Sequence, residues 1–65
     1  MSPETIKEAE AEARRFLARV AVWRKAQGTT EYNGHSYANF TPRENAAVRR
    51  ASLDLTRALA AMRKP

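Results

Sequence analysis

In two stretches of this chain, mostly apolar residues recur at alternating spacings of three and four residues. The first has the spacing 3-4-3-4-3 and comprises Ile6, Ala9, Ala13, Phe16, Val20 and Trp23. The second has the spacing 4-3-4-3 and comprises Val48, Ser52, Leu55, Leu59 and Met62. This spacing gathers apolar residues on one face of an α-helix and is typical of helices that pack side by side. The sequence therefore predicts two amphipathic helices.

The ends of the first helix carry recognisable signals. Ser2 can cap the helix, and Pro3 occupies the first helical position, where the missing N–H costs nothing. Gly28 can adopt the left-handed conformation that ends a helix. We expect this helix over residues 3–27.

The second helix is expected over residues 42–64. The preceding run Thr41-Pro42-Arg43-Glu44 is typical of a capping box. In that motif the Thr41 hydroxyl accepts from the Glu44 backbone N–H, and the Glu44 side chain reaches back to Thr41.

The connection over residues 28–41 contains the pair Asn33-Gly34, which favours a tight turn because both residues tolerate positive φ. Strands of two or three residues around this turn form only a marginal hairpin. We expect an ordered loop or a short β-turn, and a β-hairpin over residues 29–37 stays open. We also expect three aromatic residues of this connection to fold back over the helix ends: Tyr32, Tyr37 and Phe40.

The expected fold is one all-α domain over residues 1–65, an antiparallel helical hairpin. A chain of this length buries only about 60% of the surface that its unfolded form exposes, so small domains usually need a disulfide, a metal or a partner. Cysteine is absent and His35 is the only histidine, so we expect no metal site and no cofactor. Self-association or unusually good helix packing remains. We expect a homodimer that forms a four-helix bundle, although a higher oligomer stays open. Its expected interface consists of Phe16, Val20, Leu55 and Leu59.

Composition limits the class of protein and the cellular compartment that we expect. Hydrophobic residues make up 43% of it, too many for a disordered chain. No apolar run approaches the ~20 residues of a membrane span. The first residues lack the basic and apolar regions of a signal peptide, which favours a cytoplasmic protein.

Charge is distributed unevenly along the chain. The net charge is +5, with −3 over residues 1–13, +5 over residues 14–25 and +4 over residues 48–65. In an antiparallel hairpin the acidic start would meet the basic end of the second helix, namely Arg57, Arg63 and Lys64. The loop end would then be basic and aromatic. Its candidate binding residues are Arg19, Trp23, Arg24, Lys25, Tyr32, His35, Tyr37, Arg43, Arg49 and Arg50.

This loop-end set has two interpretations. Arginine and lysine can hold phosphates while aromatic rings stack on bases, so the set could bind nucleic acid or a nucleotide. The same residues could form a solvated charged face above a local aromatic cluster. At their seam positions Trp23 and Phe16 are typical of core residues, and His35 is typical of an ordinary turn residue.

Catalytic patterns are missing from the sequence. It has no Gly-rich phosphate loop, nucleophile elbow or paired-carboxylate signature. Asp54 lies two residues from both Ser52 and Thr56 on one helix, and residues two apart do not face each other, so the three do not make a catalytic arrangement. We therefore expect a protein that is not an enzyme.

Short motifs resemble the phage anti-quorum-sensing proteins, very short two-helix proteins that temperate phages express early to redirect their host. They are Phe16, Asn33 with Ser36-Tyr37, and the closing Ala58-Leu59-Ala60-Ala61-Met62-Arg63-Lys64, over residues 14–64. The stretch Ala38 to Thr41 is an insertion relative to that pattern. The resemblance implies a dimer that binds a host LuxR-type transcription activator and blocks its DNA binding. Some of this group also bind a pilus-assembly ATPase.

The chain also resembles phage head–tail joining proteins of helix–hairpin–helix form, with Asn33-Gly34 as the hairpin turn. The first helix is longer here than in that pattern. The leading hypothesis is a phage or mobile-element protein that binds and modulates a host protein in the host cytoplasm, with inhibition of a LuxR-type regulator as the expected effect. The alternatives are a nucleic-acid or nucleotide binder and a virion head–tail joining component.

Overall fold

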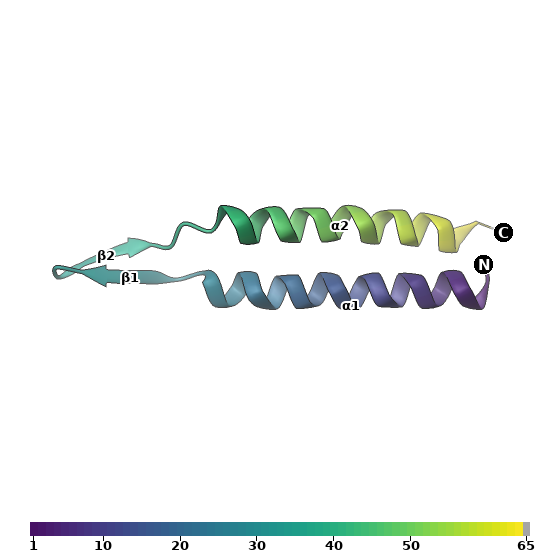
Figure 1. The fold of residues 1–65 in the computed structure, drawn as a ribbon, viewed down its shortest axis with the longest axis horizontal. Helices are drawn as coiled ribbons and strands as arrows, with labels where there is room; N and C mark the ends of the chain where they lie inside the picture. The colour runs from purple at the N-terminus through teal and green to yellow at the C-terminus, as the bar shows by residue number, and fades with distance from the viewer. Residues whose placement is uncertain (65) are drawn as a thin grey trace.

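Two antiparallel helices joined by a β-hairpin form the whole fold (Figure 1). A computed structural model describes residues 1–64. The elements are α1 Pro3–Ala26, β1 Thr29–Tyr32, β2 His35–Ala38 and α2 Pro42–Arg63. The two predicted helices are confirmed, each ending one residue before its expected last residue. The first residue lies beside the end of α2, because the Met1 ammonium group donates to the Lys64 carbonyl.

The connection is a β-hairpin, which the sequence left open, and its tip is the expected tight turn at Asn33-Gly34. The helical hairpin therefore carries a small sheet, and the purely all-α class is not confirmed. Each strand has four residues, and Tyr32 pairs with His35 around the two-residue turn. Asn33 has φ 52° and Gly34 has φ 79°, which is the pattern of a type I′ turn. This turn matches the twist of the strands and sets their register.

Asn39 explains why so small a hairpin is held in place. Its backbone N–H donates to the Gly28 carbonyl at 2.9 Å, which continues the ladder beyond β1. Its side-chain amide donates to the Ala26 carbonyl at 3.0 Å, and its Oδ1 accepts from Thr30 Oγ1 at 2.6 Å. One side chain thus joins the base of the hairpin to the last turn of α1, a support that the periodicity of the sequence does not reveal.

The two helix starts behave differently. The Ser2 hydroxyl accepts from the Thr5 N–H at 3.3 Å and the Ser2 N–H donates to Thr5 Oγ1 at 3.1 Å, so the predicted cap is confirmed as a reciprocal capping box. The capping box expected at Thr41 is wrong, because that side chain makes no cap hydrogen bond. Thr41 is buried, and its hydroxyl accepts from Gln27 Nε2 at 2.9 Å instead.

The core between the helices is thin. Ala9 and Ala51 are its buried apolar residues, and within residues 1–64 no large side chain is fully buried. The radius of gyration is 16.5 Å, whereas a compact domain of this length has about 11 Å. The molecule is therefore a rod, 59 Å long and 13 by 12 Å across.

The hairpin extends along the axis of the rod (Figure 1). Tyr32 is 69% exposed, Tyr37 56% and Phe40 91%. The expectation that these rings fold back over the helix ends is therefore wrong, because the strands continue away from the helices.

Ion pairs lie within α1 and not between the helices. Glu10 pairs with Arg14 at 3.4 Å, and Glu12 pairs with Arg15 at 3.9 Å. The acidic start of α1 does lie beside the basic end of α2, because Glu8, Glu12 and Arg57 line one open hollow of about 460 Å³. Within residues 1–64 these side chains do not close to an ion pair between the helices. In the part of the chain that is described, no helix is long and apolar enough to cross a membrane.

Candidate functional site

The β-hairpin has one aromatic face. Residues directly opposite in an antiparallel pair share a face, and faces alternate along each strand. The pairs Thr30–Tyr37 and Tyr32–His35 therefore lie on one face. We call these four residues the aromatic face. The rings of His35 and Tyr37 lie 6.4 Å apart between centroids, at an interplanar angle of 58°.

The aromatic face is open to solvent. Every residue of β1 and β2 is exposed, and Phe40, which follows them, is the most exposed of the large hydrophobic residues in the described part of the chain. Tyrosine offers a rigid apolar ring with a hydroxyl that can donate or accept, so it suits recognition of another surface. Thr30 and Phe40 were missed by sequence reasoning. The alternation of faces would have indicated Thr30 once the strands were assigned, whereas nothing in the sequence predicts the exposure of Phe40.

Trp23 and Phe16 have structural positions. Both are half-buried between the helices. The Trp23 indole Nε1 donates to Asn45 Oδ1 at 2.8 Å, so the polar edge of the ring is already bound within the chain. The interpretation of these two residues as core residues fits this arrangement better than a role as free anchors.

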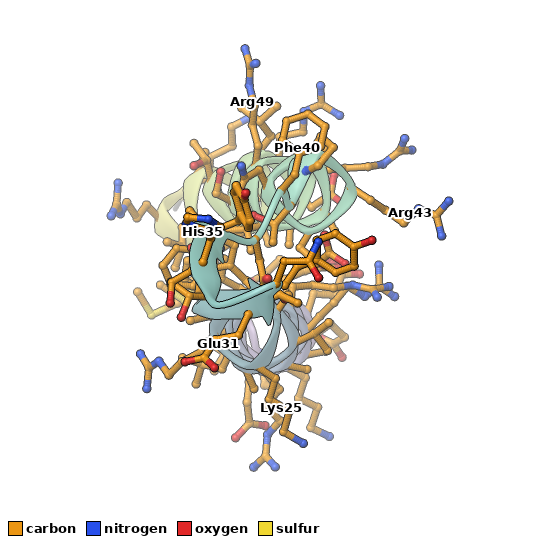
Figure 2. All side chains as sticks on the ribbon, turned by 90° about the vertical axis from the view of Figure 1, so that its left-hand side faces the viewer. Lys25, Glu31, His35, Phe40, Arg43 and Arg49 are labelled. Atoms are coloured by element: carbon orange, nitrogen blue, oxygen red, sulfur yellow. The ribbon has the colours of Figure 1, made fainter. Side chains whose placement is uncertain are left out.

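The basic residues of the loop end do not form one patch. In Figure 2, which views the rod from the hairpin tip, Lys25 points away beyond α1, Arg49 points the opposite way beyond α2, and Arg43 points to one side. Arg24 lies about 100° around α1 from Lys25. The predicted binding set is therefore divided among several faces of the rod.

Arg19 and Arg50 do come together. They line a hollow of about 240 Å³ between the helices, with Arg15 beside them and Ala47 and Ala51 among the lining residues. Asp54 lines the same hollow and offsets part of the positive charge. Arg15 was missed by sequence reasoning, and its i,i+4 spacing from Arg19 is the signal that could have found it.

The opposite side of the helix pair is apolar. At about 100° per residue, the apolar residues next to the seam fall on the side away from the hollow of Arg15, Arg19 and Arg50. We call this the apolar side; it comprises Ile6, Ala13, Leu17, Val20, Val48, Ser52, Leu55 and Leu59. Of these residues Ile6 is 45% exposed and Leu17 is 64% exposed, and the others are half-buried. Three of the four predicted dimer residues lie here, while Phe16 lies in the seam.

Comparison with known proteins found no match. No protein-family model matches it, no curated protein matches it, and no solved structure matches it. Among residues 1–64 no group of three or more His, Cys, Asp or Glu side chains could hold a metal ion. The candidate site is thus defined by the geometry of the hairpin and the helix pair alone.

Proposed function

We propose that this protein is a homodimeric protein-binding module without catalytic activity, which binds and inhibits a host protein on behalf of a phage or mobile element. The observation that carries the proposal is the β-hairpin, which holds Tyr32 and Tyr37 in solvent beyond the helix pair (Figure 1). Large aromatic side chains are the usual anchors of protein–protein interfaces. The hairpin is the surface that contacts the partner.

The apolar side supports the dimer. A core of two buried alanines is small for a chain that has no disulfide. Exposed Leu17 and half-buried Leu55 leave apolar surface in water, and burying it contributes roughly 25 cal/mol per Å². A second copy laid on this side produces a four-helix bundle and covers both residues.

The resemblance to phage anti-quorum-sensing proteins supplies the partner class. Such a partner is a LuxR-type transcription activator in the host cytoplasm, and the bound module prevents it from binding DNA. The dispersed orientations of Lys25, Arg43 and Arg49 favour a protein partner over nucleic acid, since phosphate binding over a large surface needs cations on one face.

A gel-shift assay tests this function. Purified LuxR-type activator and its promoter fragment are mixed with the protein, and the shifted band should disappear. The double variant Tyr32→Ser, Tyr37→Ser should restore the shifted band. Val22→Ser is the matched control, because Val22 is also exposed but lies on α1 away from the hairpin.

A host-lysate pull-down, with and without nuclease, extends the test beyond one partner. Recovery of a protein that survives nuclease treatment and is lost with the tyrosine variant supports the proposal. Recovery of nucleic acid alone contradicts it and favours the nucleic-acid alternative.

The β-hairpin also favours a second candidate, a virion head–tail joining component. The order helix, β-hairpin, helix with its turn at Asn33-Gly34 is the form that this resemblance implies. The 24-residue α1 is longer than that pattern. Mass spectrometry of purified particles separates the two candidates, because a joining component is found in the particle and an early host-directed inhibitor is not.

A further inference from the structure

Three exposed residues on α1 bear on how two copies would meet. Glu10, Leu17 and Arg24 are spaced by seven residues and all are exposed, Leu17 at 64%. Positions seven apart lie within about 20° of one another around a helix, so the three form one strip. This strip runs along α1 at the outer edge of the apolar side. An acid and a base thus flank a leucine at equal distances.

A two-fold axis at Leu17 makes this strip complementary to itself. If a second α1 lies antiparallel with its Leu17 against the first, Glu10 of one copy meets Arg24 of the other. Two-fold symmetry then gives two such ion pairs around one leucine contact. The leucine, which the single chain leaves in water, becomes buried.

The strip on α2 has the same symmetry. Asn45, Ser52 and Leu59 are also spaced by seven residues, with Ser52 in the centre. Ser52 lies at about the level of Leu17, because Arg15 and Arg19 of α1 line one hollow with residues 47–54 of α2. A single two-fold axis can therefore pass through both Leu17 and Ser52. This axis places Ser52 against Ser52 of the second chain, and Leu59 against Asn45 of the second chain.

The alternative dimer has both hairpins at the same end, and it lacks these matches. There α1 of one copy lies against α2 of the other, so Glu10 faces Leu59 and Arg24 faces Asn45. It also places like charges together. Residues 17–52, the half with the hairpin, carry +4 from six basic and two acidic side chains, whereas the remainder carries +1 from six basic and five acidic. The antiparallel dimer keeps the two +4 halves apart.

We infer that the protein works as an antiparallel dimer, a rod that presents one aromatic face at each end. The inference rests on the proposed dimer and adds its direction. At 1.5 Å per helical and about 3.3 Å per strand residue, the two copies of Ser36 would lie about 60 Å apart. Such a rod is bivalent, so it fits a partner that offers two identical sites, such as a symmetric oligomer, and it gains avidity from both.

A single cysteine tests the direction, because the natural chain contains none. Under mild oxidation Ser52→Cys should form a covalent dimer, since each Ser52 faces its own copy. Leu53→Cys is the control: it is exposed on the neighbouring position about 100° around α2, and it should stay uncrosslinked. If neither Ser52→Cys nor Leu17→Cys crosslinks alone while an equimolar mixture of the two variants does, the hairpins lie at the same end and the inference is wrong.

Charge reversal supplies an independent test. Arg24→Glu and Glu10→Arg should each weaken the dimer by about tenfold, because each places like charges together at two symmetric sites. The double reversal should restore the dimer, and Lys25→Glu, about 100° away on α1, should leave it unchanged. If all four variants dimerise with the same affinity as the natural protein, the antiparallel arrangement is wrong, while the proposed dimer itself stands. A wild-type protein that stays monomeric contradicts both the arrangement and the proposed dimer.

Discussion

The indole Nε1 of Trp23 donates a hydrogen bond to Oδ1 of Asn45 at 2.8 Å. It joins the last turns of α1 to the first turn of α2, at the level where the hairpin begins. Together with the Gln27–Thr41 hydrogen bond it forms a polar joint that fixes both helices under the hairpin. The joint explains how a hairpin without a core of its own keeps a defined direction.

Loss of this hydrogen bond should lower stability slightly. Asn45→Ala removes the acceptor, and because Asn45 is exposed we expect a loss of about 0.5 kcal/mol, or about 2–4 °C in Tm. Trp23 is the only tryptophan, so its fluorescence reports on this joint during thermal unfolding. Arg49→Ala, also exposed on α2, is the control and should leave Tm unchanged. An unaltered Tm and emission maximum in Asn45→Ala would show that the joint is not formed in solution.

The turn of the hairpin depends on Gly34. Its φ of 79° is a conformation that residues with a Cβ rarely adopt, so Gly34→Ala should weaken the hairpin by about 1 kcal/mol. NMR cross-strand contacts between Thr30 and Tyr37 should decrease in the variant, while the helical signals stay unchanged. Ser36→Thr keeps the strand conformation and should preserve these contacts. Equal contacts in Gly34→Ala and the natural chain would contradict the type I′ turn.

The two helix starts should respond differently to mutation. Ser2→Ala removes a capping box and should cost about 1 kcal/mol. Glu44→Ala should cost less than about 0.5 kcal/mol, because Thr41 makes no cap hydrogen bond with it. Urea unfolding followed by circular dichroism measures both differences. A larger effect at Glu44 than at Ser2 would mean that the capping box predicted from the sequence does form.

Sequence periodicity located the helices but not the hairpin. Regular spacing and the Ser2 cap are local properties of the chain, and they give the bounds of α1 and α2 to one residue. The hairpin depends on Asn39, whose contacts with Gly28 and Ala26 arise only when segments distant in sequence meet. The local sequence predicted Thr41 as a helix cap, whereas its hydroxyl accepts a hydrogen bond from Gln27, which is distant in sequence.

The candidate site was predictable only in part. Tyr32, His35 and Tyr37 were selected from the sequence, and the strand register places them on one face. The basic members of the set come from two short stretches, residues 19–25 and 43–50. A helix turns by about 100° per residue, so neighbours such as Arg24 and Lys25 point to different sides. Trp23 was selected for its ring, while its hydrogen bond to Asn45 gives it a structural role.

A charge placed on the apolar side should disrupt the proposed dimer. Leu55→Asp places a carboxylate on the apolar side and should shift the protein to monomers with a marked loss of helicity at low concentration. Leu53→Asp changes the same helix, α2, at an exposed position off the seam, and this variant should remain dimeric. Analytical ultracentrifugation across a concentration series distinguishes the two. A dimer in both variants would place the interface elsewhere.

The mass of the folded protein at micromolar concentration tests the central claim most directly. One chain has a mass of 7.3 kDa, so light scattering coupled to size-exclusion chromatography should give twice that value, about 14.6 kDa, for the natural protein. Circular dichroism of the same fraction should show the two helices. A well-folded helical species of 7.3 kDa would contradict the dimer, and with it the bivalent rod.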